Sequence, residues 1–365
     1  MICVAVLCIT LTLGLWPFRA PRNEVAWLGP HAGLRFGRYG TIFSSSSFQS
    51  TSPNDSGYSL DIWLQPGFIW NSNTFLAFYS PTNPVRFSLR QSQTYLLLKT
   101  TGQDDQHPAK TAQLYVAEVF PKSRPVFITI TSGARGTAIY LDGVLAKTAP
   151  RFLLSPKAFT GRLVVGDSPR QGDSWFGKLL GLAIYHQELN ETQVFNNYVT
   201  WKQKGRPELT RDEHNVALYL FDEHMGNVVR DKAGSGVDLY VPEKYTVIDQ
   251  VFLEPLWTEF SMTRSYWGAV VKNIVGFIPF GFCFYAYLAT VLSMRRATLV
   301  TVALGTAVSL TIEILQAYLP TRDSGTTDLI TNTLGTWIGV ATYSLLAPAV
   351  NRNLPAVAPP CPPHQ

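Results

Sequence analysis

The sequence is poor in charge. Asp, Glu, Lys and Arg make up 15% of its 365 residues, whereas about 25% is typical of a soluble protein. Hydrophobic residues reach 46% and aromatic residues 13%, so the composition favours a chain that is partly embedded in a membrane. The shortage is uneven, because charge almost disappears over residues 270–350.

Clustered basic residues and paired cysteines are also lacking. The formal net charge is only +5 and no Lys/Arg run stands out, which argues against nucleic acid as a partner. Cys3, Cys8 and Cys283 lie in apolar segments and Cys361 lies in the Pro-rich tail. This pattern provides neither a disulfide framework nor a CxxC zinc site, and we expect no metal or other cofactor, with the exception of calcium considered below.

The first 18 residues form an apolar segment that predicts an N-terminal transmembrane anchor. A cleavable signal peptide is the alternative, and it requires a basic start and a small-residue cleavage site. No Lys or Arg precedes the apolar run, and Trp16, Pro17 and Phe18 are bulky at its end. The segment therefore favours an anchor that is not cleaved.

Three further apolar segments lie in the C-terminal part, over residues 270–292, 297–319 and 329–350. Each is close to the length of about 20 residues that crosses a bilayer as a helix. Three such segments in close succession disfavour the alternative of a buried helix in a soluble core. We therefore predict an all-α transmembrane bundle over residues 250–350, followed by a disordered Pro-rich tail over residues 351–365.

The connections between these segments predict an orientation. Arg295 and Arg296 lie in the first connection, whereas the second pairs Arg322 with Asp323. Since basic residues gather on the cytoplasmic side, the dibasic connection is the better cytoplasmic marker. The loop of Arg322 and the large middle domain are then external, although Arg19 on the same side runs against the rule.

The middle of the chain, residues 19–249, has the pattern of an all-β domain. Short alternating or apolar stretches, such as residues 58–64, 126–130 and 138–141, are separated by turn residues, which is typical of a β-sandwich. Asp142-Gly143 between two such stretches predicts a tight hairpin, because both turn positions require a positive φ.

The order of residues 58–66, 139–144 and 176–185 resembles the laminin-G-like, concanavalin A-like jelly rolls, and residues 189–194 look like the short helix that ends many of them. Residues 216–222 look like the opening strand of the same fold, so the C-terminal segment is expected to close the sandwich. The resemblance implies a lectin, an adhesion module or a glycoside hydrolase. Hydrolysis requires two neighbouring carboxylates, whereas Asp61 stands alone on its strand, so we expect a module that binds a carbohydrate or a protein.

Three residues of this domain are candidates for a ligand loop. Asp167, Asp173 and Trp175 have the chemistry to line a sugar or calcium site. The alternative is that the two aspartates are solvated loop residues and that the tryptophan belongs to the core.

Polar residues inside the C-terminal segments are costly in hydrocarbon, so each is a candidate functional residue. Two stripes follow helical spacing, and we expect them to face each other. The first contains Thr306, Ser309, Glu313 and Gln316, and the second contains Asp328, Asn332, Gly335 and Gly339. The preceding segment adds Lys272 and Asn273 near its outer end, with Gly276 and Pro279 deeper. We expect the glycines to allow close helix packing and Pro279 to kink its helix.

Clustering of the three helices would bring Lys272, Glu313, Arg322 and Asp328 together near the external surface of the membrane. Two interpretations remain open at this point. The charges can pair with one another and hold the bundle together, or they can line a pocket for a polar lipid head group or a peptidoglycan precursor. In the second case Arg322 is the natural partner of a phosphate or a carboxylate.

Four motifs in this region, residues 272–281, 313–316, 320–324 and 328–335, resemble the VanZ-like membrane family. That family is named for a protein linked to resistance to the glycopeptide antibiotic teicoplanin. The resemblance implies a multi-pass protein of the bacterial inner (cytoplasmic) membrane, with a link to the cell envelope or the glycopeptide response. The jelly roll is then inserted after the N-terminal anchor.

These observations together predict an envelope protein in the lipid bilayer whose exported jelly roll binds a glycan or an envelope protein. The predicted polar core of its membrane domain consists of Lys272, Asn273, Glu313, Gln316, Arg322, Asp328 and Asn332. The alternative is a membrane enzyme that acts on a lipid-linked cell-wall precursor, with Glu313 or Asp328 as general acid or base and Arg322 holding phosphate. A transporter is less favoured, because no internal repeat is found.

Overall fold

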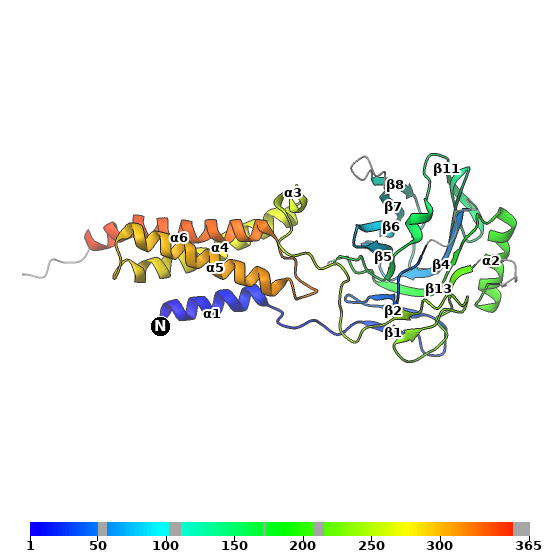
Figure 1. Ribbon diagram of the computed structural model, residues 1–365, viewed down its shortest axis with the longest axis horizontal. Helices are drawn as coiled ribbons and strands as arrows, with labels where there is room; N and C mark the ends of the chain where they lie inside the picture. Colours follow the sequence, from blue (N-terminus) through cyan, green and yellow to red (C-terminus); the bar gives the residue numbers. More distant parts are fainter. Residues whose placement is uncertain (50–56, 102–110, 171–172, 208–214, 353–365) are drawn as a thin grey trace, which may run out of the picture. The chain divides into compact units, whose positions relative to one another are not determined.

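The computed structural model describes residues 1–49, 57–101, 111–170, 173–207 and 215–352. The chain forms two compact units (Figure 1). The sandwich unit covers residues 20–250, and the helical unit combines residues 1–19 with the chain that follows Gln250. Most of the predicted Pro-rich tail, from residue 353 onward, lies outside the described residues.

The sandwich unit consists of two antiparallel sheets, which confirms the predicted all-β jelly-roll fold. The first sheet has the order β1 (Val25–Trp27), β2 (Leu34–Phe36), β13 (Gly177–Tyr185), β4 (Tyr58–Pro66), β9 (Val126–Gly133), β10 (Gly136–Leu141) and β11 (Val144–Ala149), and β14 (Asn215–Tyr219) also pairs with β13. The second has the order β15 (Val228–Val229), β16 (Leu239–Tyr240), β3 (Ile42–Ser44), β12 (Arg162–Val165), β5 (Ser72–Ser80), β6 (Asn83–Ser92), β7 (Tyr95–Thr101) and β8 (Thr111–Val116). A short 3₁₀ helix, η1 (Pro156–Phe159), precedes β12.

The core lies between the two sheets, and alternate side chains of each strand point into it. Leu60, Ile62 and Leu64 of β4 are completely buried, and their neighbours across the ladder include Ile128 and Ile130 of β9. The predicted hairpin is present, since Asp142 and Gly143 have φ values of 50° and 79° and join β10 directly to β11. Strand β14 pairs with β13, so the C-terminal segment does complete the first sheet.

The outer face of the first sheet is covered by α2 (Glu191–Lys204) (Figure 1). The helix begins with a capping box, in which Asn190 and Gln193 exchange hydrogen bonds, and ends at Gly205 in the left-handed conformation. Asp61 lies completely buried beneath it. The Asp61 carboxylate accepts hydrogen bonds from Thr129 Oγ1 at 2.6 Å, Tyr185 Oη at 3.0 Å and Asn197 Nδ2 at 2.9 Å. Asp61 therefore fastens α2 to the sheet.

The helical unit contains α1 (Ile2–Leu15), α3 (Leu256–Glu259), α4 (Arg264–Leu288), α5 (Met294–Gln316) and α6 (Thr326–Arg352). Among the described residues, α4 and α5 are the two helices long and apolar enough to cross a membrane by length and composition. The helices begin earlier than the predicted segments. Helix α4 starts at Arg264, after the capping residue Thr263, whose hydroxyl accepts the N–H of Tyr266. Helix α4 continues through Pro279.

Glycines bring α4 and α6 into backbone contact. A Cβ atom added at Gly335 would lie 2.3 Å from the carbonyl oxygen of Ile274, and one at Gly339 would lie 2.2 Å from that of Ile278. These two glycines thus face α4, although the stripe that contains them was expected to face α5. Gly276 does not have the predicted packing role, because an added Cβ there would meet nothing within 4 Å. It lies two residues from Ile274 and Ile278, which places it on another side of α4.

This packing predicts different effects for two substitutions in the helical unit. Gly339→Ala forces a methyl group into the backbone of α4, and we expect a loss of about 1–3 kcal/mol of stability. Gly276→Ala has free space and a better helix former, so we expect it to melt no lower than the parent. Thermal unfolding of the full-length protein in detergent tests this, and equal melting temperatures for the two variants would contradict the packing described.

Candidate functional site

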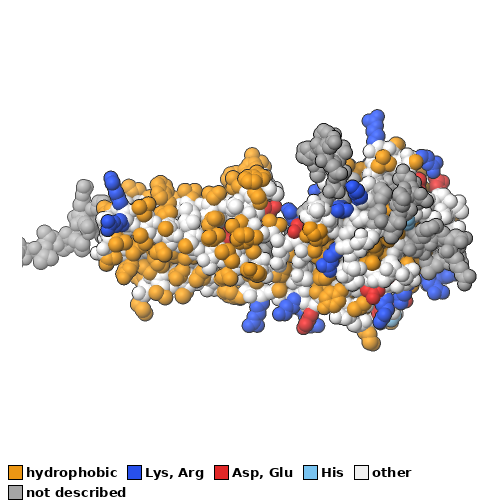
Figure 2. Space-filling view, in the orientation of Figure 1, with side chains coloured by type: hydrophobic (Ala, Val, Ile, Leu, Met, Phe, Trp, Pro, Cys, Tyr) orange, Lys and Arg blue, Asp and Glu red, His pale blue; other side chains and the backbone are white. Residues whose placement is uncertain are grey.

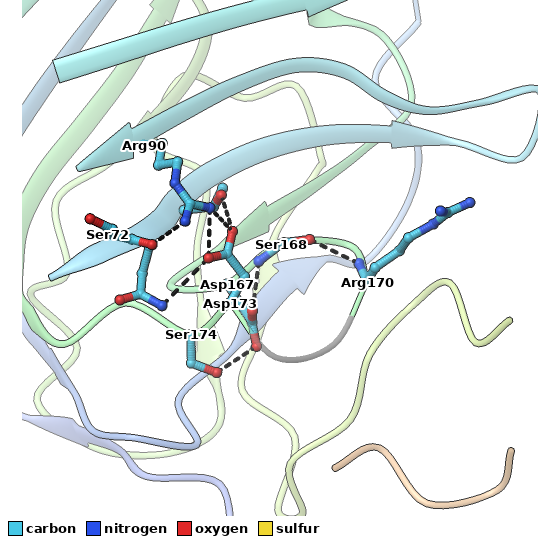
Figure 3. Close-up of polar contacts among 9 residues, drawn as sticks. Ser72, Arg90, Asp167, Ser168, Arg170, Asp173 and Ser174 are labelled. Atoms are coloured by element: carbon cyan, nitrogen blue, oxygen red, sulfur yellow. Dashed lines mark hydrogen bonds and ion pairs between the residues drawn. The ribbon is translucent and has the colours of Figure 1, made fainter. Parts of the chain in front are cut away.

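The predicted ligand loop of the sandwich unit is engaged in internal contacts (Figure 3). Asp173 pairs with Arg90, whose Nη1 lies 2.7 Å from Oδ1 and 2.6 Å from Oδ2. Thr74 Oγ1 donates a further hydrogen bond to Asp173 at 2.5 Å, and Arg90 also contacts the carbonyl of Ser72. Since this carboxylate is neutralised by a strand residue, it holds the loop against β5 and β6.

Asp167 is completely buried. Its carboxylate accepts hydrogen bonds from Ser174 Oγ at 2.7 Å, Tyr245 Oη at 2.6 Å and the backbone N–H of Ser168 at 2.7 Å. Burial raises the pKa of Asp167 to about 7, and the nearby charge of Asp173 acts in the same direction, while the three hydrogen bonds oppose the shift. Asp167 thus links its loop to the C-terminal segment of the sandwich.

Trp175 is a core residue. It is 1% exposed, and its Nε1 donates to Gln91 Oε1 at 2.8 Å. Its ring packs against Phe36 and Phe75. The alternative of a core tryptophan is therefore correct for Trp175, whereas Asp167 is not the solvated loop residue of that alternative, because it is completely buried.

Among the described residues, no group of three or more His, Cys, Asp and Glu side chains is placed to hold a metal ion. The calcium ion expected at the loop of Asp167 and Asp173 stays a prediction.

The helical unit contains a cavity of about 630 Å³. The residues predicted as its polar core all line it: Lys272, Asn273, Glu313, Gln316, Arg322, Asp328 and Asn332. Gly276 and Pro279 of α4 also line it. Helix α1 supplies an apolar wall with Val6, Ile9 and Leu13. The spacing of polar residues on separate helices thus identified one side of the cavity, whereas the role of α1 was missed.

Hydrogen bonds fix the acidic and amide side chains of this cavity. Glu313 is 1% exposed and accepts the backbone N–H of Gly325 at 2.9 Å. Asp328 accepts Asn273 Nδ2 at 2.7 Å, so α6 is tied to α4. Asn332 Nδ2 donates to Ser309 Oγ at 3.0 Å. The polar stripe of α5 therefore meets α6 through Asn332, while Asp328 turns to α4.

Two side chains hold the C-terminal end of α1. Gln316 Nε2 donates to the carbonyl oxygen of Gly14 at 2.7 Å, and Arg322 Nε donates to that of Trp16 at 2.9 Å. The last carbonyls of a helix have no partner within it and carry partial negative charge. Arg322 is thus well placed at this helix end, and it also lines the cavity.

The two acidic residues of the cavity are held by hydrogen bonds, and the charge of Arg322 also acts on Asp328. Within the described part of the chain, neither Glu313 nor Asp328 forms an ion pair with Lys272 or Arg322. Two acceptor atoms, Gln316 Oε1 and Asn332 Oδ1, are buried without a hydrogen-bond partner in the structure. The hypothesis that these charges pair with one another stays a prediction, and the two amide oxygens can accept hydrogen bonds from a ligand.

The raised pKa of Asp167 predicts how the stability of the sandwich changes with pH. Because the folded value of about 7 lies above the ordinary value of 3.8, the folded state binds this proton more tightly. The contribution of Asp167 is then full below about pH 4 and is lost as pH rises toward 7, by at most about 1.4 kcal/mol per pH unit. We expect Asp167→Asn to melt at a temperature that rises, relative to the parent, between about pH 4 and about pH 7 and stays level above that.

Circular dichroism of the β-sheet signal in the full-length protein measures this difference. Glu118→Gln is the control, because Glu118 is exposed and its substitution should leave the pH dependence of the parent unchanged. A parallel pH dependence in the parent and in Asp167→Asn would show that Asp167 is ionised throughout this range.

Comparisons with known proteins find two families along the chain, and the VanZ/LLP1 match begins inside the sandwich unit. Residues 218–347 match the model of the VanZ/LLP1 family, and residues 39–195 match the model of the concanavalin A-like lectin/glucanases superfamily. No curated protein matches the chain.

The chain is also similar to solved structures. A putative carbohydrate binding protein from Bacteroides ovatus is 15% identical, with a TM-score of 0.41, over 60% of this chain and 61% of that one. The receptor binding domain of botulinum neurotoxin type G is 17% identical, with a TM-score of 0.32, over 48% and 50%. A SAP-like pentraxin from Limulus polyphemus is 14% identical, with a TM-score of 0.34, over 61% and 96%. This chain thus covers less than two thirds of the first two structures.

Both resemblances noted in the sequence are confirmed by the family models. The chain combines a concanavalin A-like jelly roll with a VanZ/LLP1 region.

Proposed function

We propose that this chain is a multi-pass protein of the bacterial inner membrane whose helical unit binds an anionic, lipid-like molecule. Its sandwich unit, on the external side, is proposed to bind a carbohydrate or a protein. The observation that carries the first part is the convergence of seven polar residues from α4, α5, α6 and the loop of Arg322 on one cavity that α1 lines with apolar side chains.

The surface of the helical unit supports insertion into a membrane. Hydrophobic side chains gather along the helices (Figure 2). The exposed ones include Val271 and Val275 of α4, Leu299 and Leu304 of α5, and Ile330, Leu334 and Leu345 of α6. An apolar surface of this extent is costly in water and favourable in lipid.

The two ends of the helical unit differ in a way that supports the proposed orientation. Trp16, Trp257, Trp267 and Tyr318 are exposed at the end where α1 and α5 finish and α4 begins. Trp and Tyr are enriched at membrane interfaces. Arg295 and Arg296 lie at the opposite end, in the first turn of α5, and basic residues favour the cytoplasmic side. The chain leaves α1 and returns to α3 at the aromatic end, so this orientation makes the sandwich external.

The lining of the cavity suggests the chemistry of the ligand. Lys272 and Arg322 offer cationic donors, and the planar guanidinium of Arg322 matches the geometry of a phosphate or a carboxylate. Val6, Ile9 and Leu13 of α1 offer apolar contact. A volume of about 630 Å³ falls within the range of small-molecule sites. A phosphate-bearing head group with an attached acyl or polyprenyl chain satisfies both requirements.

A second candidate is an enzyme that acts on a lipid-linked cell-wall precursor. It is favoured by the presence of two carboxyl groups, Glu313 and Asp328, in the same cavity as Arg322. A carboxyl group can act as general acid or base beside a phosphate held by arginine. Turnover of a lipid-linked pyrophosphate that Glu313→Gln abolishes while binding persists would establish this second candidate.

The proposed lipid site predicts a specific loss of affinity. We expect the parent protein to bind phosphatidylglycerol in preference to phosphatidylcholine, because only the former presents net negative charge to Lys272. Lys272→Gln should weaken phosphatidylglycerol binding about 5- to 10-fold, which is typical of one lost charge-assisted contact. Native mass spectrometry of the detergent-solubilised protein with each lipid measures the effect. Lys122→Gln, on an exposed loop of the sandwich, is the matched control, and equal losses in the two variants would refute the site.

The proposed orientation predicts which loops a membrane-impermeant thiol reagent reaches. In a background without the native cysteines, Lys122→Cys in the sandwich should react in intact spheroplasts. Ser293→Cys, just before α5, should react only after the membrane is opened, because its loop is cytoplasmic in the proposed topology. The reverse labelling pattern would overturn the orientation.

A further inference from the structure

A second, smaller cavity lies in the sandwich unit between the first sheet and α2. Its volume is about 300 Å³. Its side chains come from four elements: Trp63 of β4, Arg124 just before β9, Asp142 of the β10–β11 turn, and Tyr198 and Lys202 of α2. We infer that this cavity is a binding subsite for an acidic saccharide. This inference rests on the proposed carbohydrate-binding function of the sandwich unit, and it assigns that function a location.

Two aromatic rings give the cavity its apolar surface. Trp63 and Tyr198 are half-buried, so part of each ring remains accessible. Phe127 is 2% exposed beneath them, with its ring centroid 5.9 Å from that of Tyr198. Binding pockets for small molecules combine aromatic walls of this kind with a few placed polar groups. The C–H face of a sugar ring fits such a wall.

The charged groups of the cavity favour a ligand that carries both hydroxyl groups and a negative charge. Lys202 Nζ donates to Tyr198 Oη at 3.1 Å and lies 5.3 Å from the centre of its ring, which holds the ammonium at the cavity. Arg124 provides a second cation. Asp142 Oδ1 accepts the backbone N–H of Phe127 at 3.0 Å, which leaves Oδ2 to accept a ligand hydroxyl. Two cations with one carboxylate suit a uronic acid better than a neutral sugar.

The cavity is held in place before any ligand arrives. Asp142 and Gly143 form the tight hairpin, and a Cβ atom at Gly143 would lie 3.0 Å from Tyr198 Cδ1, so the turn packs closely on α2. Helix α2 is in turn tied to the sheet by Asn197 and the buried Asp61. A site with fixed walls loses little conformational entropy on binding. One carboxylate in the cavity does not suffice for glycoside hydrolysis, which uses two, so we assign binding and not cleavage.

The test uses the full-length protein in detergent, with oligogalacturonate and its carboxyl-reduced, neutral counterpart as probes. We expect the parent to prefer the acidic form, and Arg124→Gln and Lys202→Gln each to weaken its binding about 5- to 10-fold, with no change in melting temperature. Lys204→Gln, on the same helix and outside the cavity, should bind as the parent does. Trp63→Ala should weaken both forms, because ring stacking does not depend on charge.

The outcomes separate this site from the broader proposal. If the parent binds the saccharides and Arg124→Gln, Lys202→Gln and Trp63→Ala bind as well as Lys204→Gln, the sandwich is a carbohydrate-binding domain with its site elsewhere. If the parent binds the neutral form as tightly as the acidic form, the assignment of an acidic ligand is wrong. If the parent binds neither form, this subsite is refuted. Binding assays with other glycans then test the proposal that the sandwich unit binds a carbohydrate.

Discussion

The cost of removing a polar group from water governs both units of this protein. In the sandwich unit, Asp61, Asp167 and Asp173 each receive several hydrogen bonds or an ion pair. A buried carboxylate without such partners would destabilise the fold by several kcal/mol. Each of these acids therefore joins segments that are distant in sequence, and these contacts stabilise the sandwich.

The helical unit obeys the same constraint in part, as does the sandwich unit, where Trp201 Nε1 is buried without a hydrogen-bond partner. Glu313 and Asp328 receive hydrogen bonds from Gly325 and Asn273, yet one acceptor each of Gln316 and Asn332 remains without a partner. Gln316 and Asn332 thus serve the fold through their amide nitrogens, while their amide oxygens are available to a ligand. This arrangement follows from packing, because glycines draw α6 against α4, whereas the side of α4 at Gly276 is left open toward α1.

Much of this arrangement could be predicted from residue spacing. Alternation over residues 58–64 and the Asp142-Gly143 pair predicted a strand and a hairpin, since both depend on local geometry. Helical spacing on separate segments identified the residues that line the helical cavity, because the cost of polar groups in an apolar helix leaves few positions for them.

The rest depends on tertiary contacts that leave no local pattern. A lone acid in a strand looks the same whether it is solvated or covered by a helix, so the role of Asp61 was not visible. Trp175 and Asp167 resembled a loop motif because their burial results from Phe36, Phe75 and Tyr245, which are remote in sequence. Helix α1 is apolar nearly all round, and no periodicity marked the face that lines the cavity.

The attachment of α1 has a consequence for how the protein is made. Its C-terminal end is held by Gln316 and Arg322, which follow it by about 300 residues along the chain. During synthesis α1 therefore emerges long before its partners exist, and the whole sandwich is made in the interval. The helical bundle is completed only when the last helices have been made, so its closure is a late and strongly non-local step.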